Sequence, residues 1–118
     1  MQLLGLRFCL VSEQSNDVIQ FFEQKLGFSN SFGQSESCDG GIFKTLNDDS
    51  WLEVWQQSEQ MPAGIMLQLV VDDADKLAEA ASNQGVELMG PMEAHGERIY
   101  FTRVPGGLNM SFQSRLNA

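Results

Sequence analysis

The sequence predicts an α+β fold built from two βαβββ modules. Three observations carry this prediction. Several short runs alternate or concentrate apolar residues in the pattern of strands. Two segments repeat apolar residues at helical spacing, and each ends at a glycine, Gly27 or Gly85. The order of strands and helix in the first half recurs in the second, which is typical of a duplicated module.

The first module, residues 1–56, is expected to open with a strand at 3–11. The segment SEQSNDVIQFFEQKLGF then predicts a helix over 16–26, with Ser15 as its N-cap and Gly27 as its stop. The apolar residues of this helix share one face: Val18, Ile19, Phe22 and Leu26. The remaining strands are predicted at 28–32, 42–46 and 51–56, separated by the loop SESCDGG and a turn at 47–50.

A linker at 57–64 leads to the second module, residues 65–118, within a single domain of 1–118. The pattern then restarts with a predicted strand at 65–71, which is rich in branched residues. Asp72-Asp73 offers a cap for a helix over 74–84, which Gly85 ends. Further strands are predicted at 86–89, 98–104 and 108–113, with a loop at 90–96 and a turn at 105–107.

Composition and charge exclude several classes of function. The chain has 118 residues, 42% hydrophobic and 19% charged, so a folded core is expected. Its net charge of −9 would repel nucleic acid and anionic membranes. The cysteines, Cys9 and Cys38, form no metal or redox motif, so reduced thiols in the cytoplasm are expected. The apolar N-terminus lacks the basic start of a signal peptide, and a soluble protein is expected.

Four segments resemble the vicinal oxygen chelate superfamily, which contains glyoxalase I, bleomycin-resistance proteins and extradiol dioxygenases. These segments are FFEQKLGF at 21–28, WLEVW at 51–55, LQLVVDDADKLAEAASNQGVEL at 67–88 and HGERIYFTRVPGGLNMSF at 95–112. The resemblance implies two βαβββ modules whose sheets curl into an open cup, and a homodimer in most members. Metal-dependent members take one ligand from the first and one from the fourth strand of each module.

The resemblance also places four residues at the metal-ligand positions of the family. They are Arg7, Glu53, Met66 and Ser111, with Leu6 replacing Arg7 if the first loop is one residue longer. A guanidinium stays protonated, and a thioether is a soft donor unsuited to hard or borderline metals. Glu53 is then the one remaining ligand, and a divalent ion needs several. We therefore expect no metal and no other cofactor.

Strand alternation predicts which side chains line the cup. With Arg7 facing the cup, Phe8 falls on the opposite face, under the first helix. The predicted ligand-binding residues combine aromatic, apolar and neutral polar groups with one charged pair: Arg7, Glu53, Trp51, Trp55, Met66, Gln68, Phe101, Arg103, Asn109 and Ser111. The sequence alone leaves the face of 98–104 open, and the resemblance favours Phe101 and Arg103 toward the cup.

Each candidate residue has a structural alternative. Arg7 and Glu53 could bind an anionic oxygen of a ligand, or they could form a structural salt bridge. Trp51 and Trp55 could stack on a ligand, or they could be core or dimer contacts. His95, the only histidine, could be a base, but an exposed and inert loop residue is the simpler expectation.

Cys9 could be a nucleophile, although a small buried residue is the simpler expectation. The function expected from these residues is metal-independent binding of a small molecule in an apolar, Trp-lined cup. The alternative is a lyase or isomerase of glyoxalase type, in which Glu53 is the general base and Arg7 stabilises an oxyanion. The expected partners are a small-molecule ligand and a second copy of the chain, with no nucleic acid and no membrane.

Overall fold

The computed structural model describes residues 1–32 and 40–116. These residues form two helical segments and seven strands, joined by turns and loops. Cys38 lies outside these residues. The chain divides into two compact units. The first unit is Arg7–Ile65, and the second unit is Met1–Leu6 together with Met66–Ala118.

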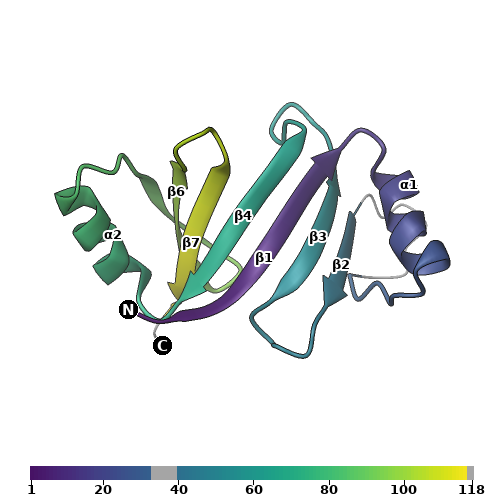
Figure 1. Ribbon diagram of the computed structural model, residues 1–118, viewed down its shortest axis with the longest axis horizontal. Helices are drawn as coiled ribbons and strands as arrows, with labels where there is room; N and C mark the ends of the chain where they lie inside the picture. Colours follow the sequence, from purple (N-terminus) through teal and green to yellow (C-terminus); the bar gives the residue numbers. More distant parts are fainter. Residues whose placement is uncertain (33–39, 117–118) are drawn as a thin grey trace. The chain divides into compact units, whose positions relative to one another are not determined.

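The first unit contains three paired strands and a helix. The elements, in order, are β1 (Leu3–Ser12, whose residues from Arg7 belong to this unit), α1 (Ser15–Gln20), the π-helical turn η1 (Phe21–Lys25), β2 (Gly40–Lys44) and β3 (Trp51–Gln56). β3 pairs in parallel with β1 and antiparallel with β2. Figure 1 shows α1 beside β2 and β3, and the buried residues Ile19, Phe43 and Val54 join the helix to these two strands.

The predicted helix at 16–26 is confirmed, but its start is not. Gln14 occupies the N-cap position and Ser15 is already helical. Ser15 is fully buried, and its hydroxyl donates a hydrogen bond of 2.6 Å to Oε1 of Gln56. The side chain therefore ties the helix to the end of β3 instead of capping it. Gly27 follows the helix with φ at +80°, the left-handed conformation expected of a helix stop.

The strand predicted at 28–32 is wrong. The Asn30 side chain accepts hydrogen bonds from the backbone N–H groups of Phe32 and Ile42, at 3.0 and 3.1 Å. The Asn30 side chain thus accepts from the Ile42 N–H of β2, a donor that a neighbouring strand would otherwise have used. Ser31 still donates its N–H to the Ile42 carbonyl, but no regular ladder forms.

The second unit contains four strands and a helix. They are β4 (Gly64–Val71), α2 (Ala74–Asn83), β5 (Met89–Ala94), β6 (Glu97–Arg103) and β7 (Asn109–Arg115). β7 runs parallel to β4 and antiparallel to β6, and β5 pairs antiparallel with β6. The βαβββ order predicted for this half of the chain is therefore confirmed.

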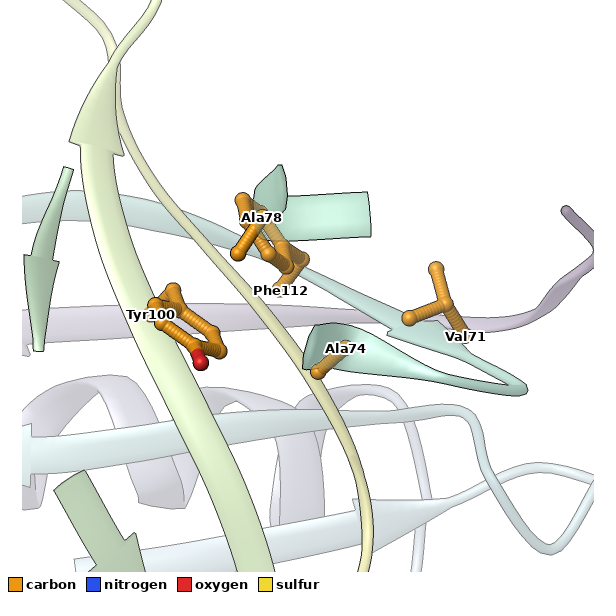
Figure 2. Packing of buried hydrophobic residues seen from close by; sticks show 5 residues of the cluster. All are labelled: Val71, Ala74, Ala78, Tyr100 and Phe112. Carbon is orange, nitrogen blue, oxygen red and sulfur yellow. The ribbon is translucent and has the colours of Figure 1, made fainter. Parts of the chain in front are cut away.

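The helix α2 is held by its own cap and by β7. The Asp73 side chain accepts a hydrogen bond of 3.1 Å from the Lys76 N–H, which confirms the predicted cap. The Ala74 N–H donates to the buried Ser114 hydroxyl at 2.8 Å. Figure 2 shows the core under this helix, formed by Val71, Ala74, Ala78, Tyr100 and Phe112.

The strand predicted at 86–89 begins at Met89 and runs to Ala94, through most of the predicted loop 90–96. Gly90 and Pro91 indicated a loop, yet both belong to β5. β5 lies beside β6 in the second unit, and its ladder is interrupted between Met89 and Met92. Such a bulge accommodates a proline, which has no N–H to donate to the partner strand. His95 and Gly96, both with positive φ, form the turn to β6.

Candidate functional site

Five of the singled-out side chains share one face of the first unit. The register of β1 and β3 pairs Arg7 with Trp51, Cys9 with Glu53, and Val11 with Trp55. Paired residues of neighbouring strands point to the same side of a sheet. The opposite side carries Phe43 and Val54 against α1. We call the side with Arg7, Cys9, Trp51, Glu53 and Trp55 the helix-free face of the first unit.

Glu53 is held by both tryptophans of the chain. Its Oε1 accepts a hydrogen bond from Nε1 of Trp51 at 2.6 Å, and its Oε2 accepts one from Nε1 of Trp55 at 2.8 Å. The three residues alternate along β3, so the spacing W-x-E-x-W puts them side by side. All three are half-buried. The carboxylate is therefore fixed in orientation while it keeps some exposure to solvent.

Arg7 is 4% exposed and contacts the backbone of Asp49 and the ring of Trp51. Its Nε donates a hydrogen bond of 3.0 Å to the backbone carbonyl of Asp49. Its Cζ lies 3.6 Å from the centroid of the Trp51 ring, a cation–π contact. Trp51 thus contacts both charged residues, Glu53 through its N–H and Arg7 through its ring face.

Cys9 is a free, buried thiol next to Glu53. Burial, together with the negative charge and hydrogen bonding of Glu53, raises the pKa of this thiol to about 12. A thiol with this pKa stays protonated at neutral pH. Cys9 is accordingly a poor nucleophile and a small buried donor beside the carboxylate.

Phe8 does not pack under the first helix as predicted. Its side chain is 50% exposed. The reason is the position of α1, which packs on β2 and β3 through Ile19 and its apolar neighbours Val18 and Phe22. The side of β1 that faces away from Arg7 is consequently left to solvent at Phe8.

Six predicted ligand-binding residues lie in the second unit, on one face of its sheet. Ser111 of β7 pairs with Gln68 of β4 and with Phe101 of β6, and Asn109 pairs with Met66 and Arg103. The opposite face carries Tyr100 and Phe112 against α2. Phe101 and Arg103 therefore share a face with Ser111, which answers the question that the sequence left open.

Neutral polar groups on this second face bond to one another. Ser111 and Gln113 are 1% and 3% exposed, and the Ser111 hydroxyl donates to Oε1 of Gln113 at 2.8 Å. Nε2 of Gln113 donates to Oε1 of Gln68 at 3.4 Å and of Glu97 at 3.5 Å. Sequence reasoning did not single out Glu97, because this residue lies just before the strand predicted at 98–104. Burial of these amides is compatible with stability because each has a partner.

The residues at the family's four metal positions do not fit a divalent ion. Arg7 and Glu53 offer a permanent cation and a carboxylate bound by two indoles. Met66 and Ser111, in the second unit, offer a thioether and a hydroxyl. Within residues 1–32 and 40–116, no three His, Cys, Asp or Glu side chains gather where they could hold a metal. This donor set lacks the several anionic or imidazole ligands that such an ion requires.

His95 is exposed at the turn between β5 and β6. It lies in the second unit, whereas Glu53 and Arg7 lie in the first.

Among the helices of the described residues, none has the length and apolarity needed to cross a membrane.

Comparison with solved structures gives the fold. A glyoxalase/bleomycin resistance protein/dioxygenase superfamily member from Vibrio splendidus 12B01 has a TM-score of 0.66 at 17% identity, covering 92% of this chain and 97% of its own. Methylmalonyl-CoA epimerase from Mycobacterium tuberculosis has a TM-score of 0.68 at 15% identity, covering 98% and 88%. An NAD-dependent benzaldehyde dehydrogenase from Legionella pneumophila has a TM-score of 0.69 at 13% identity, covering 94% and 99%.

These structural relatives carry different activities, so the likeness shows the fold alone. No family model matches the sequence, and no curated protein matches it. The chain has the α+β fold of the vicinal oxygen chelate proteins, as the four sequence segments predicted.

Proposed function

We propose that this chain, with the fold of the glyoxalase/bleomycin-resistance/dioxygenase proteins, binds a small organic molecule on the helix-free face of its first unit without a metal. The observation that carries the proposal is the double role of Trp51, which donates its N–H to Glu53 and supports Arg7 on its ring. A fixed anion, a fixed cation and two half-buried indoles offer apolar area with a few placed polar groups. That combination is typical of small-molecule sites.

The proposed ligand stacks on the exposed parts of Trp51 and Trp55 and bonds to Glu53. Each carboxylate oxygen keeps lone pairs beyond the one that its indole N–H occupies, so a ligand hydroxyl or amine can still donate to it. Arg7 supplies a positive field behind Trp51 that favours an anionic group on the ligand. The second unit's predicted residues stay candidates for ligand contacts: Met66, Gln68, Phe101, Arg103, Asn109 and Ser111.

Intrinsic fluorescence tests the proposal, because Trp51 and Trp55 are the only two tryptophans. A thermal-shift screen of benzoate, phenylpyruvate and planar antibiotics would select probes, and tryptophan emission would measure their binding. We expect a saturable response to at least one probe that Arg7→Met abolishes. Arg115→Met, at the exposed end of β7, is the matched control and should keep the response. Equal loss in both variants would count against the site.

Metal independence has its own test. Protein purified without chelator should contain far less than one equivalent of metal, and EDTA should leave probe binding unchanged. Near-stoichiometric zinc, iron, nickel or manganese would overturn the metal-free part of the proposal. Binding itself would still be judged by the fluorescence experiment.

An enzymatic function of glyoxalase or epimerase type is the second candidate. The fixed Glu53 carboxylate favours it, since a general base must be positioned within hydrogen-bond reach of the proton that it removes. Arg7 would stabilise the developing oxyanion. Structural relatives include methylmalonyl-CoA epimerases, so methylmalonyl-CoA is the probe substrate. Incubation in D₂O should introduce deuterium beside the thioester, and Glu53→Gln should stop the exchange.

Glu59→Gln is the control for that exchange experiment, because Glu59 lies in the exposed turn after β3. Absence of exchange in the unmodified protein would remove this epimerase reaction and leave the binding proposal standing. Exchange that survives Glu53→Gln would remove Glu53 as the base.

We also propose a cytoplasmic homodimer. The support is the apolar exposure of β1 in the first unit, where Phe8 is 50% exposed. Analytical ultracentrifugation should give a dimer mass, and Phe8→Ser should shift it toward the monomer. Leu46→Ser, in the turn after β2, is the control that should stay dimeric.

The net charge of −9 supports the exclusion of nucleic acid, which a salt-dependent binding assay would check.

A further inference from the structure

A groove lies in the first unit beside the end of β3, and Trp55 forms part of its lining. Its volume is about 360 Å³, within the range of roughly 300–1,000 Å³ seen for small-molecule pockets. It is lined by Phe32, Gly40, Trp55, Gln56, Gln57, Ser58 and Met61. None of these lining residues is charged, and three of them are large apolar or aromatic side chains.

Two aromatic rings form a corner of the groove. The Phe32 and Trp55 rings are perpendicular, at 89°, with centroids 4.7 Å apart. Gly40 lets the Trp55 ring approach the backbone closely, since a Cβ at that position would lie 2.2 Å from Cε3 and Cζ3 of the ring. The corner therefore depends on a glycine and has a defined shape.

The third wall is set by a tight turn. The Ser58 N–H donates to the Met61 carbonyl at 3.0 Å, and the Met61 N–H donates to the Ser58 carbonyl at 3.2 Å and hydroxyl at 3.1 Å. These bonds fix the backbone at Met61, whose side chain is 36% exposed and borders the groove. A polarisable thioether thus faces the same space as the aromatic corner.

The hydrogen bond from Trp55 to Glu53 favours cation binding on the indole ring. Its N–H donates to the Glu53 carboxylate at 2.8 Å, and such charge-assisted hydrogen bonds polarise the donor, which makes the ring face more negative. Trp51 donates to the same carboxylate and carries the Arg7 guanidinium 3.6 Å from its ring centroid. One indole bound to Glu53 therefore already holds a cation.

We propose that the groove at Phe32, Trp55 and Met61 binds a small organic cation of the quaternary or methylated ammonium class. Such cations are poorly solvated and attracted to aromatic faces, whereas an inorganic cation would lose its water without gaining an anionic oxygen ligand from this lining. The net charge of −9 raises the local concentration of any cation. This site shares Trp55 with the proposed ligand site, but its lining includes Phe32 and Met61 and not Arg7.

Choline is the probe, and its neutral carbon isostere, 3,3-dimethyl-1-butanol, is the ligand control. Two-dimensional ¹H–¹⁵N NMR resolves the two indole N–H signals, which Trp51→Phe would assign. Choline should shift the Trp55 signal saturably at constant chloride concentration, and it should bind roughly fivefold or more tightly than the isostere. Equal affinity of the two probes, or no saturable shift of Trp55, would overturn the proposal.

Variants of equal charge change separate the local effect of Glu53 from the field of the whole protein. Glu53→Gln should weaken choline binding several-fold, while Glu79→Gln, at an exposed position of α2, should leave it nearly unchanged. Equal weakening by both variants would show that general charge attracts choline and would overturn the role of the Glu53–Trp55 pair. Arg7→Met should retain choline binding even though it abolishes the response to benzoate or phenylpyruvate. Failure of one site is thus distinguishable from failure of the other.

Discussion

The Arg7 guanidinium lies over the Trp51 indole, with its Cζ 3.6 Å from the ring centroid. The Arg7 side chain is almost fully buried and donates its Nε hydrogen to the Asp49 carbonyl. A planar guanidinium can stack and donate at the same time, which an ammonium cannot do. The contact therefore depends on arginine itself and not only on positive charge.

Replacement of Arg7 by lysine should accordingly destabilise the fold although the charge is conserved. We expect the free energy of unfolding to fall by about 1–3 kcal/mol, because stacking and the Asp49 hydrogen bond are lost at a buried position. Urea unfolding followed by circular dichroism measures the change. Arg103→Lys, at an exposed position whose hydrogen bond to Asn109 is long at 3.4 Å, should change it by less than about 0.5 kcal/mol. Equal stability of Arg7→Lys and the unmodified protein would contradict the structural role of the stack.

Glu53 should control the environment of both tryptophans. Glu53→Ala removes the acceptors of two indole N–H groups, so both indole signals in NMR spectra should move upfield and exchange faster with water. The free energy of unfolding should fall by about 1–3 kcal/mol, the usual cost of leaving half-buried donors without a partner. Glu59→Ala is the control. A change at one indole alone would show that the carboxylate binds only that tryptophan.

Asp75 should make stability depend on acid. The Tyr100 hydroxyl, 2.5 Å from the carboxylate, and then Arg98 at 2.6 Å lower the pKa of Asp75 in the folded protein. Its stabilising contribution is therefore present above the unfolded-state pKa and is lost as pH falls through the folded-state value. Asp75→Asn should lower the urea midpoint at pH 7 and change it little near pH 2. A constant difference at both pH values would be the opposite result.

Cys9 should react slowly while the protein is folded. Its pKa of about 12, against an ordinary 9.0, leaves very little thiolate at pH 8. In a Cys38→Ser background, iodoacetamide should alkylate Cys9 roughly a hundredfold more slowly in buffer than in concentrated urea. Mass spectrometry follows the reaction, and Cys9→Ser in the same background defines zero modification. Similar rates in buffer and urea would indicate an accessible thiol.

Local patterns determined much of this protein in advance. Alternation along β3 placed Trp51, Glu53 and Trp55 on one face, because side chains of a strand point alternately to its two sides. The same rule puts Asn109 and Ser111 together on β7. The helix ends at Gly27 and Gly85 were also predictable, since glycine adopts the left-handed conformation without steric cost.

Other features depend on contacts between segments far apart in the sequence. The Asp49 carbonyl that binds Arg7 is a backbone group, which no residue type announces. The Asn30 side chain binds the Ile42 N–H where a strand at 28–32 was predicted to pair. Phe8 is exposed because α1 packs on other strands. The sequence by itself determined which side chains share a face, because strand geometry is local. Only the tertiary structure decided which partners they meet, because hydrogen bonds and burial join elements that the chain order does not place together.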